Sequence, residues 1–185
     1  MDPDAAQRDA IAVIERALAE AELTFERPAP GAFLVTLPGE HRLSTPCAFV
    51  VGAHTVSVNA FVARKPDENH VEVYRLLLQR NARLSGVAFA LDRLGDIYLV
   101  GRIPTATITD GDVDAVLGAI AEASDSIFDR ILVTGFASSI RREWSWRQER
   151  GQPLDNLEPF RALLHLTLED PGDETVGDGI EADDD

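Results

Sequence analysis

The feature that most constrains the fold is a change of hydrophobic period along the chain. Ile11, Ile14 and Leu18 recur at helical spacing, and a Pro- and Gly-rich segment at residues 27–31 should end this first helix. From Phe33 onward the apolar residues alternate with a period of two, which predicts strands. These strands cover residues 33–36, 47–51 and 55–62. Their connections are too short for parallel crossovers, so we expect an antiparallel meander.

The rest of the chain repeats this change of period in the order helix, hairpin, helices. The hairpin should turn at Gly95 with a positive φ. We expect further elements at 67–83 (helix), 87–91 and 97–103 (strands), about 110–135 (helix), 138–150 (helix) and 157–166 (short helix). The order is therefore α-βββ-α-ββ-α-α. Strands and helices do not alternate one by one, which favours an α+β fold with one antiparallel sheet and helices packed mainly on one face.

Capping residues mark the expected helix starts. Asp4 is a candidate N-cap for the first helix, and residues 67–69 would place acidic and capping groups in the first turn of the second. Thr109 and Asp112 resemble a capping box with Asp in place of Glu. These residues set the boundaries that the sequence predicts.

The charge balance narrows the classes of partner. The 32 acidic and 17 basic residues give a net charge of -15, which argues against nucleic acid or an anionic membrane as a partner. Residues 169–185 hold nine acidic side chains and no basic one, leaving -6 for residues 1–168. We therefore expect a single domain over 1–168 and a disordered acidic tail over 169–185. The acidic N-terminus and the short apolar runs predict a cytoplasmic protein without a membrane helix.

Residues that could carry out catalysis do not form a recognisable motif. Cys47 is the one cysteine and lies within an apolar strand, where a buried thiol is expected. The histidines are widely spread, and the acidic cluster around His70 has no second histidine nearby. Phosphate-binding glycine loops and a nucleophile elbow are both missing. We expect no enzyme activity, no cofactor and no metal.

Three polar segments remain as candidates. Asp92 and Asp96 flank the hairpin turn and either form acid–base partners or bond to the turn backbone. Arg64 or Arg93 should bridge to a nearby acid. The helix at 141–150 is either a surface helix, with a Glu143–Arg147 pair, or a binding surface. The candidate binding residues are Arg64, Asp67, Asn69, Arg80, Asn81, Asp92, Arg93, Asp96, Arg141, Arg142, Trp144 and Trp146.

Five segments together resemble a known family. Residues 37–46, 61–70, 80–81, 86–101 and 136–144 are similar to the YbjN family in its high-GC bacterial branch. The resemblance implies a fold similar to the type III secretion chaperones. Chaperones of that fold bind extended segments of partner proteins and often form homodimers, and no catalytic residues are implied for this chain.

The function predicted from these observations is a non-enzymatic protein-binding or regulatory domain, chaperone-like in fold. We expect another protein as partner and a homodimer, since the short strands leave sheet edges to cover. The alternative is a small-molecule-binding protein or enzyme with a polar pocket around Arg64, Arg80 and Asp92. The acidic tail either adds solubility or weakly screens the helix at 141–150.

Overall fold

The computed structural model describes residues 3–166, and these form two compact units that meet between residues 139 and 140 of the sequence. The predicted acidic tail and the predicted domain boundary at residue 168 lie outside the described residues, and both stay predictions.

The first unit is built on a six-stranded sheet in the order β1-β2-β3-β4-β6-β5, with every neighbouring pair antiparallel. Its strands are β1 (Phe25–Glu26), β2 (Ala32–Pro38), β3 (Ser44–Val51), β4 (Thr55–Ala63), β5 (Val87–Leu91) and β6 (Ile97–Pro104). The predicted meander and hairpin are confirmed, and Gly95 in the hairpin turn has a φ of 90°. The two-residue β1 was not predicted, because two residues are too few to show a period.

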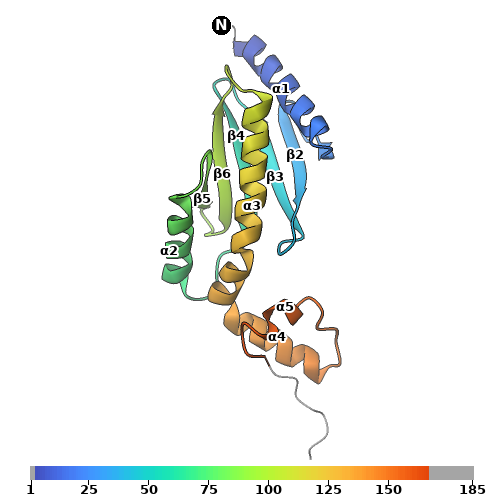
Figure 1. Cartoon of the computed structure of the whole chain (residues 1–185), viewed down its shortest axis with the longest axis vertical. Helices are drawn as coiled ribbons and strands as arrows, with labels where there is room; N and C mark the ends of the chain where they lie inside the picture. The colour runs from blue at the N-terminus through green and yellow to red at the C-terminus, as the bar shows by residue number, and fades with distance from the viewer. Residues whose placement is uncertain (1–2, 167–185) are drawn as a thin grey trace, which may run out of the picture. The chain divides into compact units, whose positions relative to one another are not determined.

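Three helices pack on this sheet: α1 (Pro3–Glu20), α2 (His70–Asn81) and α3 (Asp110–Gly135). Figure 1 shows α1 and α3 crossing one face of the sheet, with α2 beside β5. The α+β class with helices on one face is therefore confirmed. The 26-residue α3 crosses most of the sheet and packs against β2, β4, β5 and β6.

The core lies between α1, α3 and the inward side chains of the strands. Alternation decides which strand residues enter it, because successive side chains point to opposite faces. Phe33, Phe49, Val58 and Leu99 are almost completely buried. The predicted stripe of α3 is buried along its whole length at Val113, Val116, Leu117, Ile120, Ser124, Ile127 and Ile131.

Two of the predicted helix starts are wrong. The first helix begins at Pro3, so Asp4 lies in its first turn and is not the N-cap. The second begins at His70, and Asn69 precedes it in a left-handed conformation with no side-chain cap. The side-chain amide of Asn69 instead donates a hydrogen bond to the Thr134 carbonyl at 3.0 Å, a tertiary contact that local sequence patterns do not reveal.

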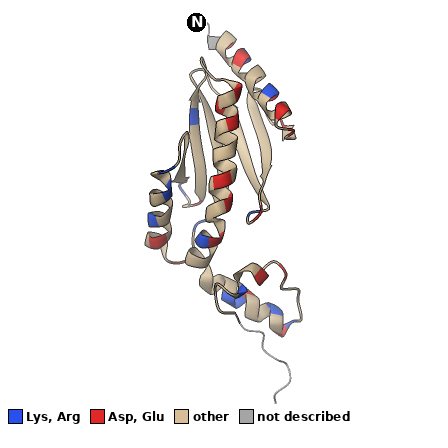
Figure 2. Ribbon diagram, in the orientation of Figure 1, with Lys and Arg blue, Asp and Glu red and all other residues tan. Residues whose placement is uncertain are grey.

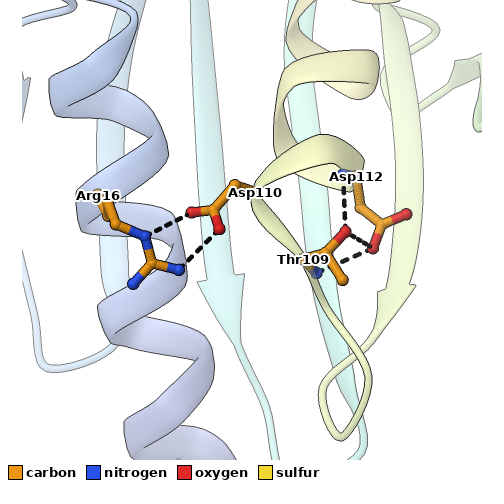
Figure 3. Close-up of polar contacts among 4 residues, drawn as sticks. All are labelled: Arg16, Thr109, Asp110 and Asp112. Atoms are coloured by element: carbon orange, nitrogen blue, oxygen red, sulfur yellow. Dashed lines mark hydrogen bonds and ion pairs between the residues drawn. The ribbon is translucent and has the colours of Figure 1, made fainter.

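The start of α3 carries the predicted capping box. Thr109 accepts from the Asp112 amide, while the Asp112 carboxylate accepts from the Thr109 amide at 2.9 Å (Figure 3). The carboxylate of the next residue, Asp110, accepts hydrogen bonds from Nε and Nη2 of Arg16 at 2.9 and 2.7 Å, as Figure 3 shows. Arg16 holds the pKa of Asp110 below its ordinary value, chiefly through this hydrogen bonding. The pair ties α1 to the first turn of α3.

The second unit starts within α4 (Ala137–Glu149) and contains the short α5 (Glu158–Arg161). The predicted last helix was too long, since its helical part has four residues. Trp144 is 2% exposed, and Leu157, Phe160 and Leu164 are also buried. The predicted Glu143–Arg147 pair is present, with Nε to Oε1 at 2.7 Å.

Candidate functional site

The segment from Arg64 to Asn69 holds the junction between α3 and α4. Arg64 forms a bidentate pair with Asp67 at 2.6 and 2.9 Å, and its guanidinium lies 4.4 Å from the centroid of the Phe136 ring. Asp67 also accepts from the Ser139 hydroxyl at 2.6 Å. The predicted bridge is therefore made by Arg64. Its hydrogen bonding with Asp67 raises the pKa of Arg64, and the exposed pair positions the loop.

Backbone contacts reinforce this junction. The amides of Asp67 and Glu68 both donate to the Gly135 carbonyl, at 2.9 and 3.2 Å. The Glu68 carboxylate accepts from the amide and hydroxyl of Ser138 at 2.6 and 2.9 Å, which satisfies free donors in the first turn of α4. The loop therefore closes the end of one helix and the start of the next.

The two aspartates of the hairpin turn both accept hydrogen bonds from backbone amides, Asp92 within the turn and Asp96 from the loop after β4. Asp92 Oδ1 accepts from the amides of Leu94 and Asp96, both at 2.9 Å, and Asp96 Oδ1 accepts from the Lys65 amide at 2.7 Å. This geometry favours the turn interpretation over acid–base chemistry. Arg93 is exposed and makes no ion pair with any residue between 3 and 166.

Asn81 protects an edge of the sheet. Its side-chain amide donates to the Phe89 carbonyl at 3.2 Å and accepts from the Phe89 amide at 2.7 Å. Phe89 lies in the middle of β5, the last strand of the sheet. The side chain thus takes the place of a neighbouring strand at that residue, which blocks pairing with another chain there.

The candidate residues do not converge on one pocket. Arg80 lines a pocket between α2 and α3 whose walls include neither Arg64 nor Asp92. In the second unit Arg141 and Arg142 are exposed, whereas Trp144 is buried. Trp146 is 46% exposed, and the Arg150 guanidinium lies 4.6 Å from its ring centroid. A binding role for these residues stays a prediction.

The loop between β2 and β3 is fastened to α3. Asp125 Oδ1 accepts from the amides of His41 and Arg42 at 2.9 and 2.8 Å. His41 Nδ1 lies 2.8 Å from Asp129 Oδ2, a hydrogen bond that raises the pKa of His41. The half-buried guanidinium of Arg42 bonds to the carbonyls of β4, and burial lowers its pKa.

Sequence reasoning missed the second face of the sheet, which we call the open face. It is formed by the outward side chains of β2 to β6, and among residues 3–139 no helix packs on it. One row crosses the five strands in register, with Ala48 paired to Leu34 and Asn59 and with Val100 paired to Asn59 and Ala88. On the next row the rings of Phe61 and Tyr98 meet edge to face at 5.4 Å.

The open face is almost uncharged and is apolar over much of β2, β3, β5 and β6, whereas β4 contributes Thr55, Ser57 and Asn59 to it. Leu34 is 39% exposed and Val50 is 48% exposed, while Ala48, Val100 and Tyr98 are partly exposed. Arg102 is the one charged side chain among the outward residues of β2 to β6, and Glu26 of β1, paired to Leu34, lies at the edge of the same face. Figure 2 shows the strands almost entirely uncharged, while both helices α1 and α3 carry acidic segments. The open face is therefore unlike the rest of a chain with a net charge of -15.

A sequence signal for this face exists. Residues 47–51 and 97–100 are apolar at every position, and β5 is likewise apolar throughout. Such continuous runs are typical of strands buried on both faces, whereas a sheet with one wet face alternates. Helices cover one face of these strands, so the runs mark the other face as a candidate binding surface.

Chemical groups for catalysis are not gathered at this face. Cys47 is buried on the helix side, and burial raises its pKa to about 12. Within the part of the chain that the structure describes, no three His, Cys, Asp or Glu side chains are grouped to hold a metal ion. No described helix is long and apolar enough to span a bilayer.

These features define a small α+β domain with one helix-covered and one uncovered sheet face. A family model named YbjN and described as "Putative bacterial sensory transduction regulator" matches residues 10–132. The chain belongs to this family, which confirms the resemblance seen in the sequence.

Comparisons with relatives and with solved structures give the following values. "Uncharacterized protein Rv0487" of Mycobacterium tuberculosis is 48% identical over 85% of this chain and 88% of its own length. "Uncharacterized protein ML2442" of Mycobacterium leprae is 48% identical over 89% of this chain and 90% of its own length. The ExsC–ExsE complex shows a TM-score of 0.49 at 13% identity, covering 66% of this chain and 93% of the solved one. The ExoU–SpcU complex of Pseudomonas aeruginosa shows a TM-score of 0.42 at 17% sequence identity, covering 63% of this chain and 95% of the solved one.

Proposed function

We propose that the chain is a non-enzymatic protein-binding domain that binds through the open face of its sheet. The single observation that carries the proposal is the uncharged row from Leu34 to Ala88, apolar except for Asn59, on a face without helices. Exposed apolar patches of this kind mark interaction surfaces in soluble proteins.

The occupant we propose is a second copy of this chain. Within β2 to β6, each copy contributes one charged side chain, Arg102, to the proposed interface. Like charges therefore do not accumulate at its centre. Asn59 lies in the middle of the row, where its amide can bond to the same residue of the other copy. Two antiparallel sheets packed face to face bury their facing side chains in a common core.

The size of the face agrees with this occupant. Strands about 4.8 Å apart and rises of about 3.3 Å per residue give the open face a footprint of roughly 500 Å². Two copies would then bury roughly 1,000 Å² in total, the lower limit for a specific interface. The edge of β5 is blocked by Asn81, which favours face-to-face association over pairing at that edge.

Thiol labelling tests the proposal. The variant Asn59→Cys places a thiol at the centre of the open face, while the native Cys47 is buried and its raised pKa disfavours the reactive thiolate. The control, Arg75→Cys, places a thiol on the exposed side of α2.

At about 50 µM chain, mass action should keep the face covered, and the Asn59→Cys thiol should react with maleimide at least about tenfold more slowly than the control. Dilution should remove the difference. Equal rates at high concentration would contradict the proposal. Equal rates would mean that the open face is accessible in the isolated chain, which is the result expected if a different protein is the partner.

A further inference from the structure

A pocket of about 600 Å³ lies between α2 and α3, away from the strands that form the open face. Its lining combines cationic, hydrogen-bonding and apolar side chains: Leu76, Gln79, Arg80, Ala82, Arg83, Ser126, Ile127 and Arg130. Three of these are arginines and none is acidic. In a chain with 32 acidic residues and 17 basic ones, this local excess needs its own explanation.

Arg80 is held in place at the wall of this pocket. Its Nη2 donates to the Ser126 hydroxyl at 3.0 Å and pairs with Glu122. Its Nε is buried and has no hydrogen-bond partner among residues 3–166. An unsatisfied buried donor is costly, and a ligand atom or a water molecule would remove that cost.

Glu122 pairs with Arg80, so the net positive charge of the pocket comes from Arg83 and Arg130. Both are exposed, and neither side chain forms an ion pair with a residue of the described chain. Figure 2 shows basic segments on α2 beside the lower half of α3. The helix dipole accounts for cations near the end of α2, but Arg130 lies well inside the 26-residue α3, where it does not.

We propose that this pocket binds a phosphate group carried by a small organic molecule. Guanidinium groups match phosphate oxygens as bidentate donors, and two uncompensated arginines suit a dianion better than a single carboxylate. The Ser126 hydroxyl and the Gln79 amide add neutral donors, while Leu76 and Ile127 offer apolar contact to the organic part. The inference is independent of the open face, which shares no residue with the pocket.

Calorimetric titration of the full chain tests the site, with phenyl phosphate, inorganic phosphate and benzoate as probes. Phenyl phosphate should bind most tightly, with a dissociation constant below about 1 mM. The double variant Arg83→Gln/Arg130→Gln, which changes two exposed side chains, should weaken it at least about tenfold. The control Arg75→Gln, on the same helix but outside the pocket, should leave it unchanged.

Three results would overturn the inference. They are the absence of saturable binding of phenyl phosphate, an affinity for benzoate equal to that for phenyl phosphate, and an equal loss in the Arg75→Gln control. Circular dichroism of the double variant would verify its fold, and the single variant Arg130→Gln gives a second measurement if the double variant is unstable.

Discussion

At the residue scale, the polar side chains that stand out in the sequence mostly hold loops and edges. Arg64, Asp67 and Asn69 fasten one helix junction, and Asp92 fastens the hairpin turn. The sequence could predict that Asp92 sits in a turn, because the aspartate and glycine types specify one. It could not predict that Asn69 bonds to Thr134, a partner 65 residues away.

Asn81 gives the sharpest stability prediction at this scale. Asn81→Ala removes both hydrogen bonds to the backbone of Phe89 and leaves a half-buried amide and carbonyl without partners. We expect the free energy of unfolding to fall by about 1–3 kcal/mol, measured by urea denaturation. Arg75→Ala, an exposed change on the same helix, should cost less than about 0.5 kcal/mol. Equal losses would mean that the edge contact adds no stability.

His41 predicts a pH dependence. Its hydrogen bond to Asp129 raises the pKa in the folded state above the ordinary value of 6.5. A raised histidine pKa means that the stabilisation is complete below about pH 6.5 and is lost as the pH rises through the folded-state pKa. Wild type should therefore lose stability relative to His41→Gln on going from about pH 6 to pH 8.5 in urea unfolding experiments. A His41→Gln profile parallel to that of the wild type would refute the linkage.

At the scale of elements, periodicity was the most reliable guide. The stripe of α3 and the alternation of β2 and β4 were visible in the sequence, because burial imposes a period on the side chains that enter the core. The start of α2 was not, because three tertiary contacts replace the expected caps at residues 67–69. The open face was missed because motif searches follow polar residues, whereas this surface is apolar.

Two glycines of α3 provide a matched test of how the helix is packed. A Cβ at Gly118 would have nothing within 4 Å, so Gly118→Ala should stabilise the protein by about 0.5–1 kcal/mol through helix propensity. A Cβ at Gly135 would lie 2.9 Å from Pro66 Cβ. Gly135→Ala should destabilise by about 1–3 kcal/mol, because the loop from Arg64 to Asn69 would be pushed away. The opposite order of the two variants in thermal unfolding would show that the loop does not pack tightly on the helix end.

At the scale of the whole molecule, residues 169–185 account for -9 of the net charge of -15. Residues 169–185 carry nine acidic side chains and lie outside the described residues, so their predicted disorder and their screening or solubility role stay predictions. The cytoplasmic location likewise stays a prediction from the sequence.

A chain stopped at Leu168 tests whether that charge opposes association. Removing nine negative charges lowers the like-charge repulsion between two copies, so we expect the truncated chain to associate at least as tightly as the full one. The difference should shrink as salt shortens the Debye length to about 8 Å at 0.15 M. Loss of association on truncation, measured by sedimentation, would assign the interface to the tail and not to the sheet.

The most direct test of the central claim is the mass of the chain in solution. Sedimentation velocity at about 50 µM should give twice the 20.2 kDa of one chain. Val50→Glu, which places a charge on the open face, should give the mass of one chain, whereas Arg93→Glu in the exposed hairpin turn should leave the dimer intact. A single-chain mass for the wild type, or an unchanged dimer for Val50→Glu, would contradict the account.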